Sequence, residues 1–228
     1  MEFGKYWHRL RRATTNGLIL CLGGLVPVAS AWSQADTGDE LEPQAVEFLE
    51  RFIADVADLT ANFEQNVFDA DDELIESSAG QFLLLRPDRF AWYYDTPYEL
   101  IVVADGESLW MYDVELEQVT RAPLSDLASS PAMLLSGEGS VSEGFRVRDA
   151  ASDDGRRWIE LLPVDDDSEF ASARIAFSDG VPGALELVDG LSQLTRIEFA
   201  DVDVNSGLRR RDFEFDPPDG VHVVGEDD

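Results

Sequence analysis

Apolar and aromatic residues are concentrated in one stretch of the chain, residues 80–97. Residues 81–85 form one such run, and residues 90–94 form a second, separated from the first by the Arg86-Pro87 pair. Their aliphatic and aromatic side chains indicate two strands, in which alternate residues share a face. If the register continues through the turn, a single face of this hairpin carries Phe82, Leu84, Arg86, Phe90, Trp92 and Tyr94.

Arg86 is the one charged side chain on this otherwise apolar face. A buried guanidinium group is unfavourable unless it meets hydrogen-bond acceptors. Arg86 therefore either keeps its head in water at a rim, or donates hydrogen bonds to a segment that closes over the face. The first alternative makes the face an ordinary sandwich core, and the second makes it a covered apolar surface.

Short alternating runs separated by turn signals fill most of the remaining chain. The Asp105-Gly106 pair lies between apolar runs at residues 101–104 and 109–112, an arrangement typical of a two-residue hairpin turn. The last predicted strand covers residues 211–215. Turn signals at such spacing predict an antiparallel β meander. Further turns are predicted at residues 69–73, 153–155, 179–180 and 205–207.

Two segments have features typical of helices instead. Apolar residues recur at helical spacing through residues 41–59, and Pro43 suits a first turn, so this segment predicts an amphipathic helix that covers another element. Residues 129–135 begin with serines and an early Pro131, and the apolar run stops at Gly137. This segment predicts a short apolar helix.

The N-terminus has the order of a secretory signal peptide: basic residues, an apolar segment at 17–28, and Ala29-Ser30-Ala31. Cleavage is predicted after Ala31, or alternatively after Ala35. Residues 1–31 are then the signal peptide, and residues 32–228 form a single domain; an uncleaved anchor is the rival interpretation. The only cysteine, Cys21, follows a leucine inside the apolar segment, so a lipoprotein signal is not expected, and the exported chain has no thiol chemistry.

The chain is strongly acidic, with 47 acidic and 17 basic residues and a formal net charge of −30. Removal of residues 1–31 makes the charge more negative, because this segment is basic overall. Such a charge argues against general binding to nucleic acid or to an anionic membrane. An acidic surface is common where salt screens its self-repulsion, which suggests a high-salt habitat.

Few residues beyond the signal peptide suit catalysis or metal binding. His222 is the only histidine there, and no glycine loop that could cradle phosphate is present. The acidic run at residues 165–167 lacks the ordered ligand spacing of a calcium loop. We therefore expect no metal site and no cofactor. Because carboxylates are abundant, a periplasmic hydrolase that uses two of them remains an alternative.

Three runs resemble the periplasmic lipoprotein carriers of the LolA family: RPDRFAWYY at residues 86–94, DGESLWMYDVELEQVT at 105–120 and SSPAMLLSG at 129–137. The resemblance covers nearly all of residues 32–228. Ser192 departs from the family, which usually has glycine at this turn position. The resemblance implies a mainly β fold: a strongly curved antiparallel sheet forming an unclosed barrel, with amphipathic helices as a lid over an apolar cavity.

The resemblance also implies a function without catalysis. The family's ligand is the acyl moiety of a lipoprotein, taken from the inner-membrane transporter LolCDE and given to the outer-membrane receptor LolB, and the protein is expected to be a periplasmic monomer. The family's arginine of the Arg-Pro motif matches Arg86, which would bond the lid helices when the cavity is empty. The expected cavity residues are Phe82, Leu84, Phe90, Trp92, Tyr94 and Trp110; the expected lid and latch residues are Arg86, Pro131, Met133, Leu134 and Leu135.

Two further alternatives share the fold. One is a carrier or sensor for another lipid, and the other is an outer-membrane receptor. The receptor would require a lipid-modified cysteine after its signal, and the sequence has none.

Overall fold

The structure is a computed structural model, and it describes residues 43–124, 141–165, 168 and 170–225. The predicted signal peptide and the predicted helix with Pro131, Met133, Leu134 and Leu135 lie outside the described residues. The described elements are, in chain order, α2 (Pro43–Asp55), β1 (Asp58–Phe68), β2 (Leu74–Leu85), β3 (Arg89–Thr96), β4 (Leu100–Asp105), β5 (Ser108–Asp113), β6 (Gln118–Pro123), α4 (Val141–Gly144), β7 (Phe145–Ala150), β8 (Arg157–Pro163), β9 (Phe170–Ser178), β10 (Val181–Asp189), β11 (Leu194–Val204), the 3-10 helix η2 (Arg210–Phe213) and β12 (His222–Gly225).

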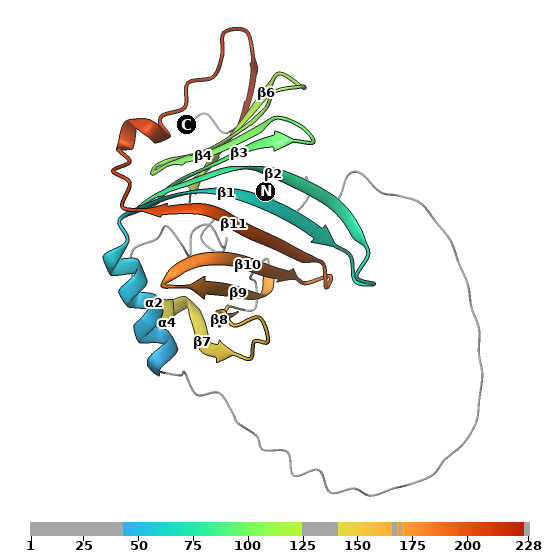
Figure 1. The fold of residues 1–228 in the computed structure, drawn as a ribbon. Coiled ribbons are helices and arrows are strands. Elements are labelled where there is room, and N and C mark those ends of the chain that lie inside the picture. The colour runs from blue at the N-terminus through green and yellow to red at the C-terminus, as the bar shows by residue number, and fades with distance from the viewer. Residues whose placement is uncertain (1–42, 125–140, 166–167, 169, 226–228) are drawn as a thin grey trace, which may run out of the picture. The chain divides into compact units, whose positions relative to one another are not determined.

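All the described strands belong to one sheet of 12 strands, in the order β12-β6-β5-β4-β3-β2-β1-β11-β10-β9-β8-β7. Neighbouring strands are antiparallel except β12, which pairs with β6 in parallel. Figure 1 shows that the sheet is strongly curved, and within the described residues its end strands β7 and β12 do not pair with each other. The predicted fold, a mainly β protein with a curved, unclosed sheet, is confirmed.

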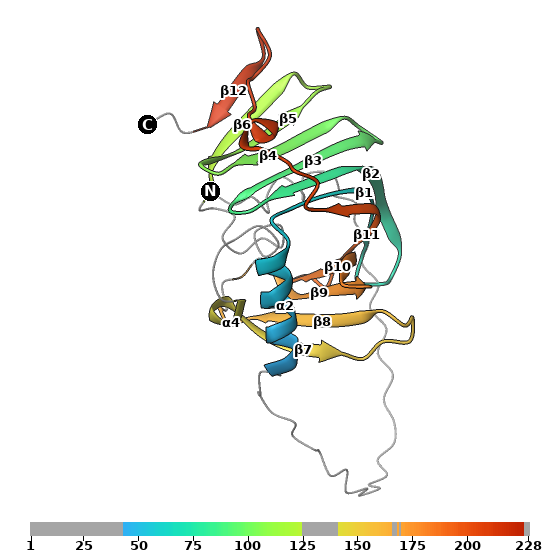
Figure 2. The same ribbon diagram turned by 60° about the vertical axis from the view of Figure 1, so that its left-hand side comes forward.

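Helix α2 packs against one face of the sheet, which we call the inner face. Its Phe48 and Phe52 rings lie 5.0 and 5.2 Å from the ring of Phe177 on β9. Figure 2 shows α2 crossing the strands at the β7 end of the sheet. The apolar stripe of this amphipathic helix is thereby buried, as the helical spacing predicted. No helix in the described parts of the chain is long and apolar enough to cross a membrane.

The segment that follows β11 covers the opposite face, which we call the outer face. Phe213 of η2 is buried there against Ala91 and Val103. The strand predicted at residues 211–215 is wrong, because this segment forms η2 and packs on the sheet instead of extending it. Phe213 and Phe215 alternate as they would in a strand, but their rings cover the outer face.

The end of α2 also differs from the prediction. The helix stops at Asp55; Val56 lies in the link that follows, and Leu59 belongs to the start of β1. Asn205 explains the stop, because its side chain accepts a hydrogen bond from Ala57 N at 2.8 Å and donates one to Asp55 O at 3.0 Å. The Asp58 carboxylate then accepts bonds from Ser206 and Gly207. A polar clamp after β11 therefore ends the helix.

The predicted turns are present, and aspartate side chains shape several of them. Asp105 accepts hydrogen bonds from the backbone N–H groups of Glu107 and Ser108, both at 2.8 Å. Asp189 does the same for Leu191 and Gln193. The Ser192 departure lies in this second turn with φ +62°, which is the left-handed region that favours glycine.

Candidate functional site

The inner face carries a continuous group of aromatic rings, which we call the aromatic cluster. The rings of Phe82 and Trp92 lie 4.2 Å apart, and Phe63 lies 4.8 Å from Trp92 and 5.0 Å from Tyr94. Phe199 of β11 completes it, 5.7 Å from Phe82. Such ring contacts stabilise the fold beyond what burial of the rings alone contributes.

Strand register shows how the sequence forms this face. Phe82 pairs with Trp92, and Leu84 pairs with Phe90, across the β2–β3 ladder. Directly opposed residues share a face, so the predicted arrangement is confirmed for Phe82, Leu84, Phe90, Trp92 and Tyr94. The first four side chains are at most 7% exposed. Whether acyl chains bind there remains a prediction.

Trp110 was expected among the cavity residues, but the structure places it on the outer face. It pairs with Val103, which packs against Phe213, and its ring lies 5.7 Å from that of Phe215. Its indole N–H donates to the Asp105 carboxylate at 2.8 Å. The β4–β5 register instead places Leu109 and Met111 on the inner face, so Trp110 is not part of the aromatic cluster.

Two aromatic cluster residues were missed from the sequence. Phe63 alternates visibly with Ala61, but nothing local shows that it meets Trp92. Phe199 joins the cluster because β11 pairs with β1, more than a hundred residues away in the chain. This long-range pairing places Phe199 directly opposite Phe63. A local hydrophobic pattern indicates the face of a side chain, but not its neighbours.

Arg86 lies at the end of the β2–β3 hairpin, next to the end of α2. One guanidinium nitrogen donates to the Val56 carbonyl, and the group lies 5.2 Å from the centre of the Phe52 ring. The Val56 N–H makes the last helical bond, to Phe52, so the Val56 carbonyl belongs to the helix end, where intrahelical donors are lacking. Arg86 therefore ties the hairpin to the end of α2.

Burial also affects the protonation of this arginine. It lowers the pKa of Arg86 to about 10, so the group remains charged at neutral pH. Within the described part of the chain, its Nε and second terminal nitrogen are buried without a hydrogen-bond partner. The predicted bonds to residues 131–135 fall outside the described residues and stay a prediction. The contact to α2 is the one that the structure gives.

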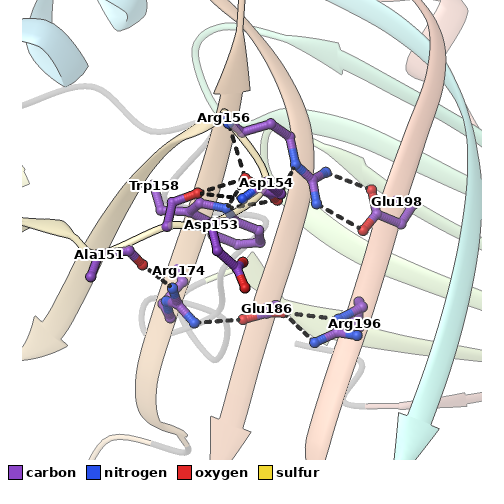
Figure 3. Close-up of a pocket in the computed structure, with 10 residues that line it drawn as sticks. Ala151, Asp153, Asp154, Arg156, Trp158, Arg174, Glu186, Arg196 and Glu198 are labelled. Atoms are coloured by element: carbon purple, nitrogen blue, oxygen red, sulfur yellow. Dashed lines mark hydrogen bonds and ion pairs between the residues drawn. The ribbon is translucent and has the colours of Figure 1, made fainter.

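The outer face has a polar depression of about 250 Å³ over β8 to β11 (Figure 3). The Trp158 ring lies between Arg156 and Arg174, 5.0 and 4.8 Å from their guanidinium carbons. Glu186 accepts bonds from Arg174 at 3.1 Å and Arg196 at 2.8 Å. Glu186 is thus shared by two arginines, and this network of opposite charges stabilises the sheet surface.

The carboxylates of this depression do not suit the hydrolase alternative. Hydrogen bonds from Ser152 and Arg156 hold the pKa of Asp154 well below its usual range, whereas a general acid needs a raised pKa. Glu198 accepts bonds from Arg156 at 2.7 and 3.4 Å. Among the described residues, no group of three or more potential ligands could hold a metal ion.

A curved, unclosed β-sheet with an aromatic inner face and an amphipathic helix packed on it is an architecture that suits a carrier of apolar ligands. The chain belongs to the outer membrane lipoprotein carrier protein LolA family, whose model matches residues 54–216. It is thus a LolA-type lipoprotein carrier, in a family of carriers and not of enzymes.

Named relatives agree with this assignment. An outer-membrane lipoprotein carrier protein of Halorhodospira halophila is 41% identical over 181 residues, which cover 78% of this chain and 85% of the relative. One of Dechloromonas aromatica is 37% identical over 183 residues, covering 80% and 88%. An uncharacterized conserved protein of Thermus thermophilus has a similar fold, with a TM-score of 0.53 at 12% identity over 80% of this chain and 99% of that one.

Proposed function

We propose that this carrier shields the acyl chains of a lipoprotein on the inner face of its sheet while the cargo crosses the periplasm. The observation that carries the proposal is the aromatic cluster, which joins four strands into one apolar surface. Each buried acyl methylene is worth about 0.8 kcal/mol, so lipoproteins with exposed chains would not cross water unescorted. The cluster offers the apolar environment that these chains need.

The route is proposed from family membership. The carrier receives its cargo from the inner-membrane transporter LolCDE and delivers it to the outer-membrane receptor LolB. Residues 1–31 direct export, and the mature chain, which begins near Trp32 or Asp36, works in the periplasm as a monomer. The names of its relatives as outer-membrane lipoprotein carriers support this route.

Arg86 is proposed to act as the latch of the empty carrier. Its bond to the Val56 carbonyl ties the hairpin to α2, and Pro131, Met133, Leu134 and Leu135 are proposed to complete the lid. A hydrogen bond from a charged group contributes about 1.5–3 kcal/mol, which the burial of a few acyl methylenes can exceed. Cargo would then break the bonds of the latch. The return of these bonds in the empty carrier would favour release of the cargo.

A charge at Phe90 tests whether the inner face binds ligand. Phe90 is 2% exposed and lies opposite Leu84. If the inner face opens to take ligand, Phe90→Glu should keep the fold, because the carboxylate can then reach water. It should weaken binding of a dansyl fatty acid at least tenfold, and likewise binding of a diacylated lipopeptide that displaces this probe, because a carboxylate disfavours an apolar ligand. Fluorescence titration measures binding, and circular dichroism reports the fold.

The matched control is Leu116→Glu, which adds the same charge at a side chain that is 71% exposed in a turn. It should bind the probe as the wild type does. If Phe90→Glu unfolds the protein outright, the face is a filled core and the carrier site lies elsewhere. If the folded variant binds normally, the aromatic cluster does not hold the acyl chains.

A further inference from the structure

Two polar side chains are buried on the inner face beside the aromatic cluster. Gln65 of β1 and Ser78 of β2 are directly opposed in the ladder, and each is only 4% exposed. Gln65 alternates with Phe63 and pairs with Ile197 on its other side. A polar pair among apolar neighbours requires an explanation, because unsatisfied buried polar groups are rare.

Tyr94 fixes the orientation of the Gln65 amide. Its hydroxyl donates to Gln65 Oε1 at 3.3 Å. Burial and the nearby negative charge of Glu76 raise the pKa of Tyr94, so this hydroxyl keeps its proton at neutral pH. Because the tyrosine occupies the oxygen end of the amide, the nitrogen end is left to donate.

Donors without acceptors remain at this point of the face. Ser78 Oγ is buried and has no hydrogen-bond partner among the described residues. The described hydrogen bonds of Gln65 use only its oxygen, so both amide hydrogens are available. Leaving the buried Ser78 hydroxyl unpaired is unfavourable, and a bound acceptor would satisfy it.

The charge nearby selects the kind of acceptor. Glu76 lies on the same strand face as Ser78, two residues closer to the β1–β2 turn, and its charge reaches Tyr94. An anionic ligand such as a free carboxylate would be repelled by it. A neutral carbonyl oxygen accepts hydrogen bonds without adding charge, so it fits these donors better.

We propose that Gln65 and Ser78 hydrogen-bond the neutral ester or amide carbonyls through which fatty acyl chains are attached to a lipoprotein. The proposal rests on the proposed function and adds a polar anchor to the acyl site. It also sets the direction of the ligand. Arg86 and the end of α2 lie at the Asp58 end of β1, and at about 3.3 Å per residue Gln65 lies roughly 20 Å further along the strand. The chains would then run from Gln65 along the aromatic cluster toward Arg86.

The test compares two lipopeptides with equal chains, one diacylated through esters and one dialkylated through ethers, which lack the carbonyls. Wild-type protein should bind the ester form at least tenfold more tightly. The double variant Gln65→Leu, Ser78→Ala should lose this preference while its affinity for the ether form stays within about threefold. Its melting temperature should fall by no more than a few degrees, because Ser78→Ala removes an unpaired hydroxyl while Gln65→Leu leaves the Tyr94 hydroxyl without its acceptor.

The matched control is Asn66→Leu, Ser77→Ala, the next opposed pair along the same ladder, whose side chains lie on the outer face. It should keep the ester preference. Equal binding of both lipopeptides by the wild type, or an ester preference that survives in the double variant, would overturn the anchor and leave the carrier function intact. Wild-type protein that binds neither lipopeptide would overturn both.

Discussion

Alanine at Gly80 is expected to destabilise the protein by several kcal/mol, enough to unfold much of it. A Cβ atom there would lie 1.8 Å from the Tyr93 carbonyl oxygen and 2.8 Å from its carbon. Both are backbone atoms of the β2–β3 ladder, whose register shifts next to Gly80, so no rotamer change can relieve the clash. Since a folded domain is stable by only about 5–15 kcal/mol, such a loss is a large fraction of the total.

Thermal unfolding followed by circular dichroism measures this effect. The matched control is Gly190→Ala, because nothing lies within 4 Å of a Cβ atom at that position. We expect the control to melt within a few degrees of the wild type and Gly80→Ala to lose its cooperative transition or melt far lower. If Gly80→Ala melted at the same temperature as the wild type, the close approach of Gly80 to the Tyr93 backbone would be refuted.

Loss of delivery is the largest functional effect that we expect, and it follows from Arg86→Leu. The fold should survive, because the change removes one hydrogen bond but also removes a buried cation with two unpaired nitrogens. Without the latch the empty carrier is less stable relative to the loaded one, so cargo is retained. A lost charged hydrogen bond of about 1.5–3 kcal/mol corresponds to a transfer equilibrium shifted about tenfold or more.

Transfer of labelled lipoprotein from the loaded variant to receptor-bearing membranes measures delivery. Arg86→Lys keeps the charge but not the planar set of donors, and should deliver partially. Arg89→Leu is the matched control, since Arg89 lies in the same hairpin end and bonds only the Pro87 carbonyl at 3.1 Å among the described residues. Normal delivery by folded Arg86→Leu protein would refute the latch.

Local alternation predicted the antiparallel meander and most of the aromatic cluster, whereas the curved, unclosed shape of the sheet was implied by the family resemblance. Phe82, Phe90 and Trp92 share a face because the β2–β3 turn is short and keeps the register. Trp110 was placed on the wrong face because the run around it is apolar on both faces. Alternation therefore cannot show which of its residues point inward. Only the pairing of Trp110 with Val103 reveals that it lies on the outer face.

The other errors have long-range causes. Helix α2 ends early because Asn205, far along the chain, bonds its last residue, Asp55, and Ala57 just beyond it. Residues 211–215 cover the outer face because Phe213 packs against Ala91. No local sequence pattern predicts this contact. The need of Arg86 for acceptors was predicted correctly, but its partner at Val56 was not. Tertiary contacts decide such cases.

Native mass spectrometry of the protein purified gently from periplasm tests the central claim most directly. The account predicts a population that carries acylated polypeptides, which disappears in the Phe90→Glu variant and accumulates in Arg86→Leu. Protein that emerges without acylated polypeptides, or carries the same amount in all three forms, would contradict the claim that the inner face transports lipoproteins.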